Sequence, residues 1–196
     1  MKKQNWVFAL ALIALTVVFI FRGSYSTINE LDTVSGIAID YKDDKWRVVC
    51  EICTPSSDND YGSASVYVKG SADTLSGAFD EAGKASANIL YTDCVQLYLV
   101  GEGARGKQEL LNYFLQDNVN LRAVTANASP EAAIALCGEA DSENSRAKSM
   151  SIAKKVKRYC SENGLPSPRV TQYLKGKAGV GITKDNVPER MVIKHD

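Results

Sequence analysis

The sequence predicts an α/β fold with a mixed β-sheet, and three observations carry this prediction. In the second half of the chain, short segments rich in β-branched residues alternate with helix-like segments, which is typical of parallel strands joined by right-handed crossovers. An apolar run near the amino terminus predicts one N-terminal transmembrane helix. The rest of the chain, which we call the body, begins with two predicted strands that flank a short polar turn and so form an antiparallel hairpin.

The apolar run spans Trp6 to Phe21, sixteen residues of which only Thr16 is polar. As a helix it would measure about 24 Å, against a hydrocarbon core of about 30 Å. The flanking Lys2, Lys3 and Arg22 can extend its reach, and the two lysines predict a cytoplasmic amino end with the body exported. We expect residues 1–22 to be an uncleaved signal anchor, with a cleaved signal peptide or a buried core helix as the alternatives.

The first part of the body contains three predicted strands and a helix. The strands are 34–40, 46–53 and 64–69, with a turn at 41–45 and a polar loop at 54–62. The alternation of Val66 and Val68 with Tyr67 and Lys69 indicates a strand with two unlike faces. Ser71 is predicted to cap the helix that follows, which carries a small apolar stripe through Leu75 and Phe79.

The second part alternates strands with helices. We expect strands at 95–100 and 121–126, helices at 106–116 and 129–136, a basic helix from 142 to 160, a short helix at 169–176 and a last strand at 190–194. The expected organisation is therefore an anchor over 1–22, an α/β domain over 28–140, and a helical extension with a terminal strand over 141–196. Helices should pack on the mixed sheet.

Composition leans away from an enzyme and from a nucleic-acid binder. The chain has 196 residues and carries 23 basic and 23 acidic residues, so it lacks the excess positive charge that binds phosphate. Its single histidine, His195, is one residue from the end, which removes the usual general base and every Ser-His or Cys-His pair. We expect no catalytic residue, cofactor or metal.

One motif suggests phosphate binding. Gly101 to Gly106 (GEGARG) matches G-x-G-x-x-G between a predicted strand and a predicted helix, where backbone N–H groups could hold an anion. However, the next strand ends at Ala126-Asn127 without an acid for a ribose hydroxyl. Glycines in such a turn also serve backbone geometry alone.

The cysteines and acids give weaker signals. Cys50 and Cys53 lie three apart on a predicted strand and so point to opposite faces. With Cys94, Cys137 and Cys160 the count is five; buried free thiols are the main expectation, with one disulfide or a metal site as alternatives. Asp58 and Asp60 lie in a polar loop and could contact calcium, or act with Asp40 as catalytic carboxylates, but a solvated loop explains them better.

An ordered series of segments resembles one known family. Residues 28–40 (INELDTVSGIAID) resemble the opening of the mature C subunit of spore germinant receptors, the Ger(x)C family, which begins E-I-N-(D/E)-L before a strand ending G-I-G-I-D. The likeness continues through 46–52, 67–79, 91–102 and 110–122, and more weakly over 150–193. In YTDCVQLYLVGE, Cys94 stands where the family usually has a histidine.

The resemblance implies a non-enzymatic component of a germinant receptor-like complex in a spore-forming bacterium. Its expected partners are the family's integral-membrane A- and B-like subunits, and its expected location is extracytoplasmic and membrane-anchored, in the spore inner membrane or the cell membrane. The family usually carries a lipobox cysteine and runs to three domains, whereas here residues 23–27 (GSYST) replace the lipobox and only the first domain is recognisable. The alternative function is an exported sensor that binds an anion or small ligand at Gly101–Gly106.

Overall fold

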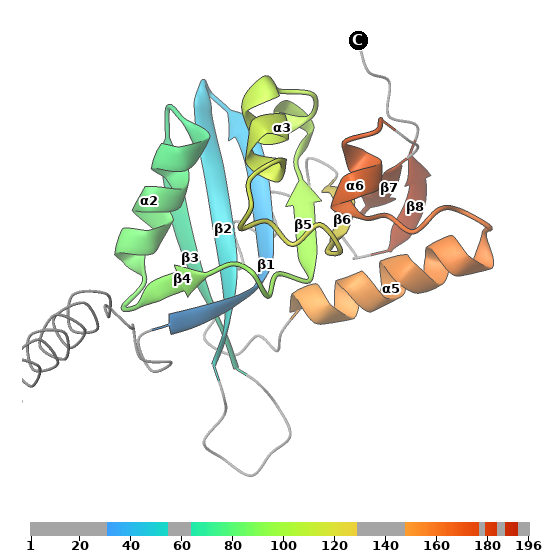
Figure 1. The fold of residues 1–196 in the computed structure, drawn as a ribbon, viewed down its shortest axis with the longest axis horizontal. Coiled ribbons are helices and arrows are strands. Elements are labelled where there is room, and N and C mark those ends of the chain that lie inside the picture. Colours follow the sequence, from blue (N-terminus) through green and yellow to red (C-terminus); the bar gives the residue numbers. More distant parts are fainter. Residues whose placement is uncertain (1–30, 55–63, 129–147, 177–178, 184–186, 192–196) are drawn as a thin grey trace, which may run out of the picture. The chain divides into compact units, whose positions relative to one another are not determined.

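The structure is a computed structural model that describes residues 31–54, 64–128, 148–176, 179–183 and 187–191 (Figure 1). The chain divides into two compact units, Met1–Leu31 and Asp32–Asp196, and all the described helices lie in the second. Several expectations lie outside the described residues: the signal anchor, the loop with Asp58 and Asp60, the helix over 129–136, Cys137 and His195. Among the described helices, none is long and apolar enough to cross a membrane.

A mixed sheet of eight strands forms the centre of the unit. The strands are β1 (Leu31–Lys42), β2 (Lys45–Thr54), β3 (Ala64–Ala72), β4 (Ile89–Tyr91), β5 (Leu97–Val100), β6 (Val124–Ala128), β7 (Gly179–Ile182) and β8 (Pro188–Met191). Seven follow the order β3-β2-β1-β5-β6-β7-β8, while β4 pairs with β1 outside this path. The expected α/β class with a mixed sheet is confirmed.

Strand directions agree with the predicted hairpin and crossovers. β1 pairs antiparallel with β2, and β2 with β3, with Ile37 opposite Cys50 and Cys50 opposite Val68. β1, β5, β6 and β7 are parallel neighbours, and β8 returns antiparallel to β7. Asp43 and Asp44 form the tight turn between β1 and β2 with positive φ values of 55° and 57°, a conformation that Asp adopts more readily than most residues.

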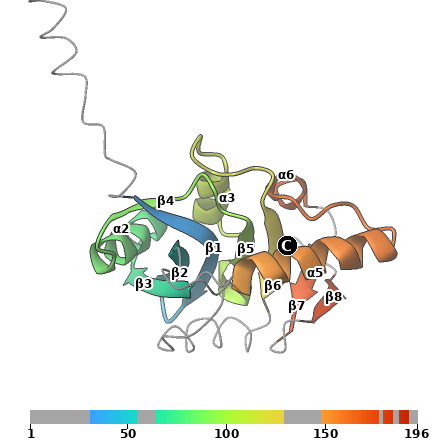
Figure 2. The same ribbon diagram turned by 90° about the horizontal axis from the view of Figure 1, so that it is seen from below.

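Four α-helices cover the described sheet: α2 (Leu75–Ala85), α3 (Gln108–Phe114), α5 (Lys148–Glu162) and α6 (Val170–Tyr173). In Figure 1, α2 and α3 lie in front of the strands and α5 runs along the lower edge. Viewed from below, α5 passes across the near ends of the central strands (Figure 2), and it packs mainly on β5, β6 and β8.

Two buried clusters lie on opposite sides of the sheet because side chains alternate along each strand. On β5, Tyr98 and Val100 face the first cluster, which we call the aromatic core; it also contains residues of α2, α3 and α6, including Leu75, Phe114 and Tyr173. Leu97 and Leu99 face the second cluster, the α5 core, which includes Ile152, Val156 and Cys160.

The structure corrects several predicted boundaries. Ser71 was expected to cap a helix, but β3 continues through Ala72 and the cap is Thr74, whose Oγ1 accepts a hydrogen bond from Gly77 N at 3.1 Å. The pairing of Trp46 with Ala72 extends the strand past Ser71. Residue 121 was expected to begin a strand, but β6 begins only at Val124 and runs to Ala128.

Two short strands and one helical turn were not predicted. β4 has three residues and β7 has four, lengths that give too little alternation to be recognised. Because β7 pairs with β6, the segment after residue 140 contributes to the same sheet as the first strands. The turn is a 3₁₀-helix, η2 (Glu102–Ala104), which stands between β5 and α3.

Candidate functional site

The glycine-rich turn after β5 is filled by the end of strand β1. A Cβ atom added at Gly101 would overlap the Asp40 carboxylate, and one added at Gly103 would overlap the Tyr41 carbonyl oxygen. Both glycines are therefore needed because β1 packs closely against the turn. Gly106 has a positive φ of 71°, which gives it a separate conformational reason to be glycine.

This packing argues against an anion site at Gly101–Gly106. An anion above Gly101 would meet the negative charge of Asp40 and occupy the space that its carboxylate already fills. The segment next forms η2, and α3 begins only at Gln108, seven residues after Gly101, so no α-helix starts directly from the turn. The guanidinium of Arg105 donates from Nη2 to the Ala128 carbonyl at 2.9 Å, which ties the turn to β6.

Asp40 is the one member of the predicted carboxylate set within the described residues. It lies near the end of β1, half-buried, and its Oδ1 is buried without a hydrogen-bond partner there. No group of three or more metal-ligating side chains is found in the described parts of the chain. The side chain of Asp40 packs against Gly101, where it fills the space that a Cβ would need.

The cysteines of the described segments are all free. Cys50 is fully buried in the aromatic core, Cys53 is half-buried on the same strand, and Cys160, a residue of α5, is buried in the α5 core. Burial raises the pKa of the Cys50 thiol to about 12 and also raises that of Cys160, so both stay protonated at neutral pH. Cys94 departs from the expected burial, because it lies exposed in the turn before β5.

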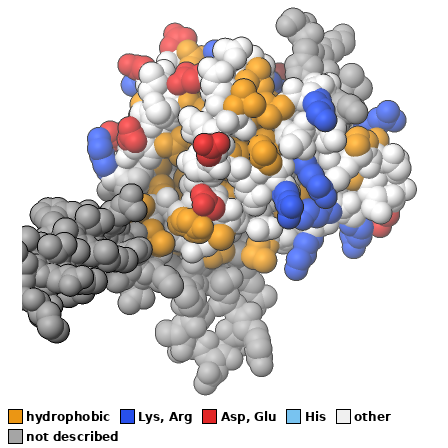
Figure 3. Space-filling view, viewed as in Figure 1, with side chains coloured by type: hydrophobic (Ala, Val, Ile, Leu, Met, Phe, Trp, Pro, Cys, Tyr) orange, Lys and Arg blue, Asp and Glu red, His pale blue; other side chains and the backbone are white. Residues whose placement is uncertain are grey.

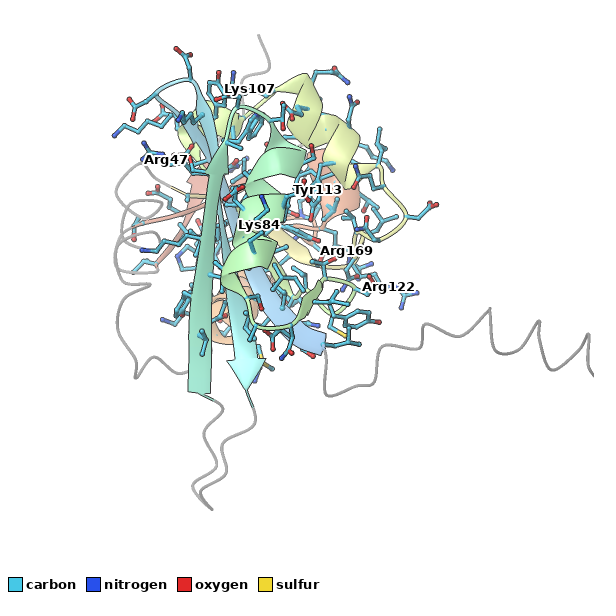
Figure 4. The ribbon with its side chains drawn as sticks, turned by 90° about the vertical axis from the view of Figure 1, so that its left-hand side faces the viewer. Arg47, Lys84, Lys107, Tyr113, Arg122 and Arg169 are labelled. Carbon is cyan, nitrogen blue, oxygen red and sulfur yellow. The ribbon has the colours of Figure 1, made fainter. Side chains whose placement is uncertain are left out.

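A groove lies between α2 and α3 on the described surface. Its volume is about 410 Å³, within the usual range for small-ligand or side-chain pockets. Figure 4 looks onto α2 with Tyr113 beyond it. The lining residues come from α2, from the β4 region and from the α3 region, and they are Leu75, Ser76, Phe79, Asp80, Leu90, Thr92, Glu109, Asn112, Tyr113, Gln116 and Asn118.

The floor of the groove is held by one hydrogen bond and one ring stack. Glu109 Oε1 accepts from the Leu75 backbone N–H at 2.5 Å, which satisfies a free N–H in the first turn of α2. The rings of Phe79 and Tyr113 stack with centroids 4.8 Å apart and planes at 19°. Burial also raises the pKa of Tyr113, so its hydroxyl remains neutral.

The chemistry of the groove is that of a recognition surface. Apolar side chains form the floor, amides and hydroxyls form the rim, and Asp80 and Glu109 are its charged residues. Figure 3 shows acidic side chains beside apolar ones on the face between α2 and α3. This groove was not predicted from the sequence, although the apolar stripe through Leu75 and Phe79 was one signal of it.

A second unpredicted feature is a buried carboxylate on the face of the sheet opposite the aromatic core. Glu51 is 2% exposed, and its oxygens accept hydrogen bonds from Ser35 Oγ at 2.7 Å, from Tyr67 OH at 2.7 Å and from Ser149 N at 3.0 Å. Burial alone would raise the pKa of Glu51, but these donors outweigh burial and hold the pKa below its ordinary value. Its signal in the sequence was a lone acid inside the apolar strand WRVVCEIC.

Glu51 and its hydrogen-bond donors Ser35, Tyr67 and Ser149, which we call the Glu51 node, join the first turn of α5 to strands β1, β2 and β3. A Cβ added at Gly36 would overlap Ser149, so the helix approaches the sheet as closely as a glycine permits. Negative charge at the amino end of a helix is favourable because free N–H groups and the helix dipole point there. We assign this node a structural role in docking α5.

Comparison with known proteins gives one family match. The family described as the spore germination protein N-terminal domain matches residues 24–176. No curated protein and no solved structure matches the chain. The match extends beyond the segments 28–40 through 110–122 from which the resemblance to the Ger(x)C family was drawn, and it confirms that resemblance.

Proposed function

This chain belongs to the spore germination protein family defined by that N-terminal domain, and we propose that it is a non-enzymatic, membrane-anchored, extracytoplasmic component of a germinant receptor-like complex. It works through contacts with integral-membrane A- and B-like subunits. The family match supports a role in spore germination. The anchor is supported by the apolar run from Trp6 to Phe21 and the two lysines before it.

The observation that carries the contact function is the α2–α3 groove. It is a concave surface of about 410 Å³ with an apolar floor, built on two helices that pack on one rigid sheet. Partner side chains that are apolar or positively charged match its Phe79–Tyr113 floor and its two carboxylates. The Gly101–Gly106 turn, by contrast, is filled by Asp40 and Tyr41.

Site-specific photocrosslinking in a spore-forming host tests this proposal. A photoreactive phenylalanine analogue replaces Gln116, an exposed residue of the groove, in the full-length chain. We expect crosslinks to multi-spanning membrane proteins encoded beside the chain, identified by mass spectrometry. The matched control carries the same analogue at Lys45, an exposed residue of the β1–β2 turn that does not line the groove.

Crosslinks from position 116 but not from position 45 support the groove as the contact site. Equal crosslinking at both positions would assign the contact to another surface. A chain that crosslinks to nothing at either position, although it is present in spores, would contradict the contact function itself.

A further inference from the structure

Basic residues are concentrated in one segment of a chain whose total charge is balanced. The segment 148–176 contains seven basic residues and a single acid, Glu162, although the whole chain has equal numbers of both. Figure 3 shows the same separation, with Lys and Arg gathered over α5 and α6 and with Asp and Glu mainly over α2 and the α2–α3 face. The described segment that holds α5 and α6 therefore presents a positively charged surface.

The outer face of α5 supplies most of this charge. Ile152, Val156 and Cys160 point into the α5 core, so the residues between them point outward at the helical spacing. These exposed residues include Lys154, Lys155, Lys157 and Arg158. The acid nearby is Glu162, whose Oε1 lies 3.7 Å from Arg158 Nε, and both of these side chains are mainly exposed. Among the described residues, none forms an ion pair with Lys154, Lys155 or Lys157.

The first turn of α5, which precedes these basic residues, lies near the start of β1, where the chain enters the folded unit. Ser149, in the first turn of α5, contacts Gly36 near the start of β1 and donates its N–H to Glu51. Ten residues lie between Phe21, the end of the apolar run, and Asp32, the first residue of the folded unit, and they span at most about 34 Å when fully extended. A domain tethered by the apolar run would thus have its basic edge within reach of the lipid surface, at high effective concentration.

We propose that the basic outer face of α5, Lys154, Lys155, Lys157 and Arg158, binds anionic phospholipid headgroups at the membrane surface. The inference rests on the proposed anchor only for the tether. Lysine favours lipid over a specific acidic protein site because its ammonium is a flexible point charge, whereas shaped carboxylate sites favour the planar, bidentate arginine. The outer side of one helix is also convex, which suits a broad charged surface.

Lysine footprinting of the full chain in nanodiscs tests this proposal. Discs are prepared from phosphatidylcholine alone and from an equal mixture with phosphatidylglycerol, and acetylation rates are read by mass spectrometry. We expect Lys154, Lys155 and Lys157 to react several-fold more slowly in the anionic discs. Lys45 is exposed at the turn of the β1–β2 hairpin, away from the end that contacts α5, and it should react equally in both kinds of disc. About 1 M NaCl should abolish the difference, since it shortens the screening length to about 3 Å.

Two variants measure the contribution of charge. Lys154→Gln removes one charge from the face and should weaken lipid association about fivefold. The acetylation rates of Lys155 and Lys157 in anionic discs should therefore rise. Lys84→Gln, on α2, should leave the footprint of α5 unchanged, because Lys84 pairs with Glu81 on another side of the unit. Unchanged circular dichroism spectra establish that both variants are folded.

Equal rates at the three lysines in both discs would overturn the proposal. Protection in native membranes that is absent from anionic discs would instead assign the face to an acidic protein. If the chain enters neither disc, the proposed anchor is wrong, and lipid binding by α5 is then tested by sedimentation with vesicles. Sedimentation with anionic but not with zwitterionic vesicles would still support lipid binding by α5. Sedimentation with neither kind of vesicle would refute it.

Discussion

The two faces of the sheet are held by different kinds of interaction. On one face, α2, α3 and α6 pack through large rings: Phe114 contacts Tyr98 and Tyr173 with ring centroids 5.2 and 5.6 Å apart. On the other, α5 packs through small aliphatic side chains and through the hydrogen bonds of Glu51. The first face depends on apolar volume, and the second depends on a charged group whose protonation changes with pH.

We therefore expect changes on the two faces to have different effects: on one face they alter the stability of the whole unit, and on the other they alter the position of α5. Removal of buried ring volume should unfold the whole unit, because the aromatic core joins strands and three helices. Loss of the Glu51 node should loosen α5 first, because the node lies at the amino end of that helix. The proposed lipid-binding face would therefore be the part of the unit most open to adjustment.

The largest effect is expected from Phe114→Ala. Phe114 is fully buried, and its removal should lower the free energy of unfolding by about 3–5 kcal/mol, measured by urea titration. Leu115→Ala is the matched control, because Leu115 is 69% exposed and its truncation should cost less than about 0.5 kcal/mol. Similar losses for the two variants would show that the aromatic core does not dominate stability.

Gly36→Ala should damage the opposite face. The new Cβ would overlap Ser149, so α5 must move, at a cost of about 1–3 kcal/mol. Hydrogen exchange should show faster exchange in α5 than in α3. Gly83→Ala, inside α2, meets no atom within 4 Å and should stabilise the protein by about 0.5–1 kcal/mol. If Gly36→Ala is as well tolerated as this control, the close approach of α5 is wrong.

Glu51→Gln tests whether the stability of the α5 face depends on pH. The substitution should cost about 1–3 kcal/mol at neutral pH, because an amide cannot accept from every donor that surrounds the carboxylate. The folded pKa is lowered, so the unfolded chain binds the proton first as pH falls, and the contribution of Glu51 is lost below about pH 4.

Urea titrations of wild type and Glu51→Gln from neutral pH to about pH 3 measure this difference. Their free energies of unfolding should converge at the acid end. Glu81→Gln changes an exposed ion pair and should cost less than about 1 kcal/mol throughout. A difference for Glu51→Gln that stays constant with pH would contradict the ionised, hydrogen-bonded carboxylate.

Thiol reactivity should distinguish the two environments without any change in stability. Cys94 is exposed and should react with an aromatic disulfide reagent in the native protein, whereas Cys50 should react only on unfolding, because burial raises its pKa to about 12. Peptide mass spectrometry assigns each modified cysteine. Native labelling of Cys50 at the rate of Cys94 would show that the aromatic core opens readily.

The sequence was informative wherever a pattern extends over many residues. The hairpin of β1 and β2, the apolar stripe of α2 and the basic α5 all follow from alternation or helical spacing. β4 and β7 were missed because strands this short depend on partners distant in sequence. The role of Glu51 was also inaccessible, since two of its donors, Ser35 and Ser149, lie 16 and 98 residues away in the chain.

The glycine motif shows how spacing alone can mislead. Gly101 to Gly106 matches a phosphate-binding pattern, yet Gly101 and Gly103 make room for Asp40 and Tyr41 of another strand. That reason for glycine depends on the parallel pairing of β1 with β5, which no local pattern reports. The α2–α3 groove was hidden for the same reason, because its lining comes from three separate segments.

The most direct test of the contact function is spore germination in cells whose own copy of the chain has a blocked groove. Asn112→Trp fills the α2–α3 groove from an exposed position on α3, and Lys45→Trp places the same side chain away from it. The account predicts slower loss of optical density for the Asn112→Trp spores alone, with equal amounts of chain in both. Germination of the Asn112→Trp spores at the wild-type rate would contradict a contact function of the groove. Germination at the wild-type rate by spores that lack the chain would contradict the role in germination itself.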